Sequence, residues 1–245
     1  MLKIQIHMNL AICTALGQTL FLVLAEQTDN KTFCKGVTAT LHYVFTSALA
    51  WTIIEGVFLY RTTAVGFKPL KIGWLCLLAY GGSFVVVGVS FGVLFETYGM
   101  GKFCWLRVED NSIFVFAGCV FGTELFSVMI LWFVMKVFSA LKANKKKDEI
   151  DKIKATARAL IILLPILGLT WISGTITSFT QSPNVTCFQY AFIICFSLQG
   201  VAIFVFHCLL VPDIKTSLKL RMSRRVVDSS WAKSRTTKST TTTSF

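Results

Sequence analysis

The sequence predicts an all-α membrane protein, and three observations carry that prediction. Hydrophobic residues make up 54% of the 245 residues and charged residues only 15%, which is too apolar for an ordinary soluble domain. The apolar residues gather in six long segments, each long enough for a helix that crosses a bilayer, which needs roughly 20 residues. The Lys and Arg residues lie mainly between and after these segments, so the net charge of +12 does not indicate a nucleic-acid-binding protein.

We expect transmembrane helices at residues 4–25, 36–60, 72–95, 113–138, 156–179 and 188–211. Their hydrophobicity is continuous, whereas the strands of an outer-membrane barrel alternate between apolar and polar residues. The sequence therefore predicts a six-helix bundle within residues 1–211.

The distribution of basic residues predicts the orientation of the helices. Only four of the 24 Lys and Arg residues lie on one side of the predicted spans, namely Lys31, Lys35, Lys102 and Arg107. The positive-inside tendency places the opposite side, with both ends of the chain, in the cytoplasm. We therefore expect a multi-pass protein of the plasma membrane.

Two N-x-T triplets, which begin at Asn30 and Asn184, lie in the predicted outer loops and are candidate glycosylation sites. Residues 1–25 also fit a cleaved secretory signal, because Lys3 precedes the apolar run and small residues end it. The length of this run and its internal polar residues favour a retained span.

Three of the eight cysteines lie at outer ends or loops, where oxidation is possible: Cys34, Cys104 and Cys187. A bridge between Cys34 and Cys104 would hold the loop before the fourth span over the mouth of the bundle. A free thiol and a pairing with Cys187 are the alternatives, and the residues alone do not rank the three.

The chain after the last span is basic and then polar. Residues 212–225 predict a short amphipathic helix on the anionic inner leaflet, and residues 226–245 predict a disordered tail. The tail ends in Thr243-Ser244-Phe245, a shape that carboxylate-capturing domains accept, and its hydroxyl groups are candidate phosphorylation sites for arrestin-like binders.

Five stretches occur in order along the chain: IHMNL at 6–10, residues 33–60, FCWL at 103–106, LLPILGLTWISG at 163–174 and SLQGVAIFVFHCLL at 197–210. Together they resemble the seven-helix bundle of the adhesion family of G-protein-coupled receptors, which are relatives of the secretin-type receptors. The resemblance implies that this chain corresponds to helices two to seven of such a bundle.

In the resembling family the first helix is preceded by an extracellular region that carries a tethered agonist peptide. We therefore expect the chain alone to insert into the membrane but to respond to an agonist peptide only when an upstream span is supplied. The resemblance also implies the disulfide between Cys34 and Cys104.

The fifth predicted span contains its own helix breaker. Pro165 lacks an N–H, and Gly168 and Gly174 loosen the helix around it, so we expect a kink. The resemblance implies that this helix swings outward on activation and that Trp171 acts as its switch. A static kink, with Trp171 as a packing residue, is the alternative.

Ionisable groups inside a membrane usually face partners or water, which makes His7 and Glu55 candidates for function. Both lie at a similar depth, so they can bond across two helices, either as a permanent structural pair or as a switch. The resemblance implies an inner polar lock that breaks on activation. It also implies an agonist pocket and second hinge at Phe45, Trp51, Gln199 and Gly200.

The predicted function is a receptor that transmits agonist-induced helix movement to a heterotrimeric G protein, with no catalytic centre, metal site or cofactor. A truncated non-signalling fragment or decoy is one alternative. A small transporter or channel is another, in which His7, Glu55 and Glu124 would form a proton or ion path. The chain departs from the family at Tyr80-Gly81-Gly82-Ser83, where the family has an aromatic-Gly-x-Pro sequence.

Overall fold

The computed structural model describes residues 2–63, 71–99, 103–106 and 112–141, together with Ile194, Cys195 and Leu198. The described part is helical: α1 (Leu2–Leu24), α2 (Lys31–Thr63), α3 (Ile72–Cys76), the π-helix η1 (Leu77–Gly81), α4 (Gly82–Val93) and α5 (Ser112–Leu141). Because α3, η1 and α4 follow one another directly, they form one span, Ile72–Val93.

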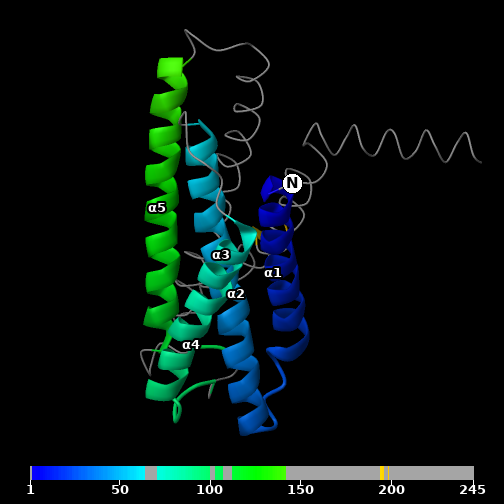
Figure 1. Ribbon diagram of the computed structural model, residues 1–245. Coiled ribbons are helices and arrows are strands. Elements are labelled where there is room, and N and C mark those ends of the chain that lie inside the picture. Colours follow the sequence, from blue (N-terminus) through cyan, green and yellow to red (C-terminus); the bar gives the residue numbers. More distant parts are fainter. Residues whose placement is uncertain are drawn as a thin grey trace, which may run out of the picture. The chain divides into compact units, whose positions relative to one another are not determined.

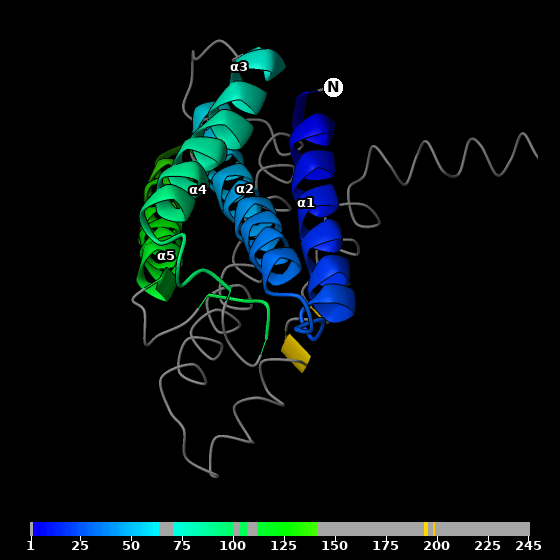
Figure 2. The same cartoon turned by 90° about the horizontal axis from the view of Figure 1, so that it is seen from below.

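Helix α2 is the centre of the described bundle, as Figure 1 and Figure 2 show from two directions. It packs against α1 on one side, α5 on the other, and η1 and α4 on a third. Successive spans run in opposite directions. We call the end of the bundle at Cys34 and Cys104 the disulfide end and the opposite end, at Arg61, the Arg61 end.

Helix α1 packs into the bundle through one buried face. Its buried residues recur every three or four positions, which is the period of one helix face: Ile6, His7, Leu10, Cys13, Thr14 and Gly17. Gly17 lets α1 approach α2 closely, because a Cβ at Gly17 would lie 2.6 Å from the ring of Phe45 on α2.

The opposite faces of the described helices carry large exposed apolar side chains. On α4, Phe84 is 70% exposed and Val93 is 77% exposed, and on α5 Leu125 is 75% exposed. Apolar surface of this extent does not suit contact with water, and all four spans are long and apolar enough to cross a membrane. These faces suit contact with lipid.

Several Ser and Thr hydroxyl groups inside the described spans bond to their own helix. Thr14 donates to the Leu10 carbonyl oxygen at 2.9 Å, Thr38 to that of Cys34 at 2.9 Å, and Ser83 to that of Ala79 at 2.6 Å. Each acceptor is four residues earlier, so the hydroxyl needs no partner from water.

The described helices occupy the positions of the first four predicted spans, and the prediction of a helical membrane protein is confirmed to that extent. The predicted spans at residues 156–179 and 188–211 lie outside the described residues, apart from the helical residues Ile194, Cys195 and Leu198. The predicted juxtamembrane helix and tail also lie outside them.

The loop after α4 turns at Gly99, whose φ of +70° lies in the left-handed region that favours glycine. A Cβ at this position would collide with the hydroxyl oxygen of Thr38 and would lie 3.0 Å from the carbonyl oxygen of Cys34. Gly99 therefore allows the loop backbone to lie directly on the first turns of α2.

Replacement of Gly99 by Ala is expected to lower the midpoint of thermal unfolding of the detergent-solubilised protein. The strained φ alone costs about 1–3 kcal/mol, and the collision with Thr38 adds to it. Gly36→Ala is the matched control, because a Cβ there meets open space within a helix and Ala is the better helix former. Equal midpoints for the two variants would contradict this account of the loop.

Candidate functional site

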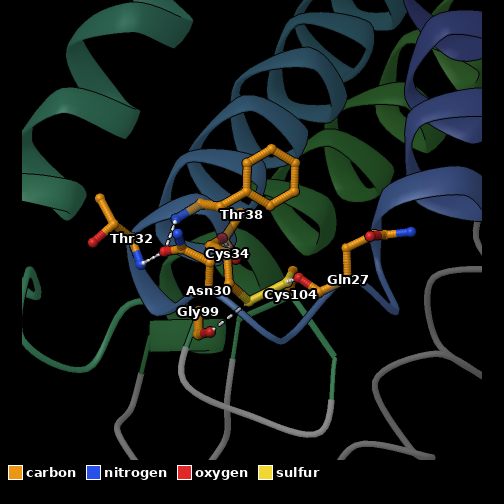
Figure 3. Close-up of a disulfide and its surroundings, with 8 residues drawn as sticks. Gln27, Asn30, Thr32, Cys34, Thr38, Gly99 and Cys104 are labelled. Atoms are coloured by element: carbon orange, nitrogen blue, oxygen red, sulfur yellow. Dashed lines mark hydrogen bonds between the residues drawn. A yellow bond between two sulfur atoms is a disulfide. The ribbon is translucent and has the colours of Figure 1, made fainter.

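The disulfide end is held together by the bond between Cys34, at the start of α2, and Cys104, in the loop that precedes α5 (Figure 3). Their Cα atoms are 5.0 Å apart, and both residues are buried. The backbone N–H of Cys104 also donates to the carbonyl oxygen of Ala25 at 2.7 Å. The loop is therefore attached to the ends of both α1 and α2. The structure thus has the bridge between Cys34 and Cys104, which is the pairing that the resemblance implies.

Asn30 directly precedes helix α2 and caps its first turn. Its side-chain oxygen accepts bonds from the backbone N–H groups of Thr32 at 3.0 Å and Phe33 at 3.2 Å, which have no partner within the helix (Figure 3). Asn30 is exposed, so its side-chain nitrogen remains available to a glycan. The predicted glycosylation site is thus also a helix cap.

Trp105 from the same loop inserts between three helices. Its ring makes edge contacts with Phe21 of α1, Phe45 of α2 and Phe116 of α5, at centroid distances of 5.9, 5.7 and 5.3 Å. Aromatic pairs in this geometry are favourable beyond the area they bury. Phe45, a predicted pocket residue, is therefore in contact with the loop.

A second side chain also anchors the loop. Tyr98 is fully buried, and its hydroxyl bonds to Nδ1 of the fully buried His42 on α2. Burial raises the pKa of the Tyr98 phenol above its ordinary value, so the hydroxyl stays protonated at neutral pH and can donate to a neutral imidazole. The loop is thus fixed by its tyrosine as well as by its disulfide.

Trp51 lies deeper in the bundle than Phe45. It is fully buried and packs with residues of α1 and of the third span, and its ring makes an edge contact with Tyr80 at 5.7 Å. Phe45 belongs to a different cluster, at the disulfide end. The structure therefore does not bring these two predicted pocket residues into one cluster.

His7 and Glu55 meet between α1 and α2 toward the Arg61 end. Nδ1 of His7 lies 3.3 Å from Oε1 of Glu55, and the two side chains are 8% and 3% exposed. A carboxylate and an imidazole at this distance form an ion pair when the imidazole is protonated. The structure thus brings together two groups that an apolar environment would otherwise disfavour.

The other predicted residues, Pro165, Gly168, Trp171, Gly174, Asn184, Gln199 and Gly200, lie outside the described residues. Within the described part, no group of three or more His, Cys, Asp or Glu residues could hold a metal ion. Glu124 on α5 is half-buried, and its Oε1 has no hydrogen-bond partner among the described residues.

The sequence alone did not predict three contacts. These are the ring contact of Trp105 inside the bundle, the hydrogen bond between Tyr98 and His42, and the hydrogen bond from Tyr80 to Asn9. One signal was available, because His42 is an ionisable residue in an apolar segment, as His7 is. The two loop contacts follow from the path of the loop, which no periodic pattern marks.

These features define a class of protein: a multi-pass helical membrane protein whose polar groups meet inside the bundle and whose loop is fixed at one end. Comparison with known proteins identifies the family. The family model described as "7 transmembrane receptor (Secretin family)" matches residues 2–203. The chain belongs to the secretin family of seven-transmembrane receptors.

The similar curated proteins are adhesion receptors. The chain is 32% identical over 221 residues to adhesion G protein-coupled receptor E5 of Bos taurus, covering 87% of this chain and 29% of that protein. It is 31% identical to the human adhesion G-protein coupled receptor D1 (89% and 25%) and 34% identical to the mouse adhesion receptor L1 (85% and 14%). The chain thus spans about a quarter of the length of the first two relatives. The predicted adhesion-receptor family is confirmed.

Replacing Asn30 by Ala is expected to lower the thermal unfolding midpoint, because the first N–H groups of α2 lose their acceptor at a cost of about 0.5–2 kcal/mol. Asn30→Asp keeps the cap but removes the glycan acceptor, and Thr32→Ala removes only the N-x-T triplet. We expect both to keep the cap's share of the stability. In protein made without glycosylation, Asn30→Ala should therefore unfold at a lower temperature than Asn30→Asp and Thr32→Ala. If the three variants unfold at the same temperature, the cap has no role.

Proposed function

We propose that the chain is the membrane-embedded signalling part of an adhesion-type receptor, and that it transmits agonist-induced helix movement to a heterotrimeric G protein. The observation that carries the proposal is the contact between His7 and Glu55, which joins α1 to α2 near the face where a cytosolic partner would bind. Family membership supports a receptor of this type.

The pair suits a two-state device because it is buried and crosses two helices. Outward movement of either helix separates the groups, and loss of one polar partner in a low dielectric costs about 1–3 kcal/mol. A bias of that size shifts the ratio of two conformations by about 5- to 150-fold. The pair therefore favours the conformation in which it is closed, which we assign to the inactive receptor.

The disulfide end suits the agonist. Trp105, Phe45, Phe21 and Phe116 form an apolar aromatic contact between three helices, and the loop that carries Trp105 is fixed above it. A tethered or free peptide with large apolar side chains would bind here, and its contacts with these rings would favour separation of the helices toward the Arg61 end, while the disulfide end stays closed. Trp51 below, with Trp171, Gln199 and Gly200, would form the floor of the pocket and the switch.

The remaining parts of the proposal concern residues outside the described part. The kink at Pro165, with Gly168 and Gly174, would let its helix swing outward at the cytosolic face. The tail would bind arrestin-like or carboxylate-capturing proteins, and the basic segment before it would bind anionic lipid. Glycans at Asn30 and Asn184 would mark the outer side.

His7→Ala and Glu55→Ala are each expected to raise agonist-independent nucleotide exchange on the G protein by about 5- to 150-fold per surface receptor, because each removes the bias toward the closed conformation. The measurement is nucleotide exchange in membranes of cells that express the chain, alone and preceded by the first span of a relative such as human receptor D1. The double variant is expected to match the single variants, since both remove one interaction.

Met8→Ala is the control, because Met8 is adjacent to His7 in sequence but is 54% exposed on the apolar surface. It should leave basal exchange unchanged. Variants at His7 and Glu55 that lose surface expression without any gain in exchange would instead show a permanent structural pair, and the proposal would be wrong.

A further inference from the structure

The third span contains a π-helical turn, and Tyr80 within it contacts both of the helices that His7 and Glu55 join. The Tyr80 hydroxyl donates to the side-chain oxygen of Asn9 on α1 at 2.8 Å and lies 3.6 Å from the sulfur of Cys13. Its ring makes an edge contact with Trp51 on α2 at 5.7 Å. One side chain of the third span thus touches α1 and α2 together.

The π turn suits the spacing of the buried residues in this span. The span buries Leu75, Ala79, Ser83, Val87 and Ser90, and the first four of them recur every four positions. In a plain α-helix each step of four overshoots one turn by about 40°, so Val87 would lie about 120° away from Leu75 around the axis. A π turn adds roughly one residue to the helix and takes up most of that rotation.

The turn therefore helps to keep the buried side chains from Leu75 to Val87 directed into the bundle. It lies at Leu77–Gly81, directly before Gly82, where the chain has Gly-Gly-Ser in place of the family's Gly-x-Pro. A glycine pair accommodates an altered helix geometry without a proline.

Tyr80 acts close to the inner pair. Asn9 is two residues after His7 on α1, and Trp51 is one turn before Glu55 on α2. Any movement that separates α1 from α2 at His7 and Glu55 must also change the position of Asn9 or Trp51 relative to Tyr80. In the bilayer core no water replaces the bond that Asn9 would lose.

The geometry points to Tyr80 as a positioning residue of the switch: its hydroxyl bond to Asn9 and its ring contact with Trp51 hold α1 and α2 in the arrangement in which His7 reaches Glu55. This inference rests on the proposed function. It adds a third helix to the inner contact, so the third span takes part in the transition.

Tyr80→Phe is the sharpest test, because it keeps the ring and removes only the hydroxyl. Basal nucleotide exchange per surface receptor is expected to rise about three- to fifteen-fold, the range that the strengths of hydrogen bonds between membrane helices give. Asn9→Leu is expected to produce a rise of similar size, and the double variant is expected to add nothing to either single variant.

Tyr43→Phe makes the same chemical change on α2 away from this contact and should leave basal exchange unchanged. If His7→Ala raises exchange and Tyr80→Phe lowers only the unfolding temperature, Tyr80 is merely structural and this inference is wrong, while the proposed function stands. Additive effects of Tyr80→Phe and Asn9→Leu would also overturn it. If none of the variants at His7, Glu55 and Tyr80 raises exchange, the proposed function fails with it.

Discussion

The need to satisfy polar groups without water governs this bundle. A bilayer core offers no hydrogen-bond partners, so each polar side chain of a spanning helix must bond within its own helix or meet another inside the protein. Helix α2 shows the consequence most fully, since it carries the buried polar residues Thr38, His42, Ser47 and Glu55. The buried Thr46 hydroxyl is an exception, with no hydrogen-bond partner among the described residues. A helix with that content is stable only at the centre, with other helices around it.

The two ends of α2 meet that need in different ways. At the disulfide end the partners come from a loop: Tyr98 bonds His42, Gly99 lies against the first turns, and Cys104 is covalently joined to Cys34. Toward the Arg61 end Glu55 meets the imidazole of His7 on α1. A covalent, multiply anchored end and an end whose described polar contacts are all non-covalent differ greatly in how readily they open. This asymmetry suits a receptor that is fixed where ligand arrives and moves where a cytosolic protein binds.

The sequence predicts more of the helices than of their contacts. Long apolar runs predict the spans, because a bilayer demands a minimum length of apolar helix, and the rise per residue placed His7 and Glu55 at one depth. The π turn left a trace in the four-residue spacing from Leu75 to Val87, which a search for apolar length does not register. The insertion of Trp105 and Tyr98 depends on the path of a loop, which is set by contacts distant in sequence. The cap at Asn30 was predictable, because Asn30 is a polar residue directly before a helix. The same residue begins an N-x-T triplet, and we interpreted it only as a glycosylation site.

The central claim is that the contact between α1 and α2 opens toward the Arg61 end while the disulfide end stays closed. Double electron–electron resonance tests it directly, with spin labels at Ile4 and Tyr60 for one end and at Leu22 and Phe33 for the other. On addition of nucleotide-free heterotrimeric G protein, the account predicts that the distance between Ile4 and Tyr60 lengthens while that between Leu22 and Phe33 does not change. A distance between Ile4 and Tyr60 that stays the same in the coupled complex would contradict it.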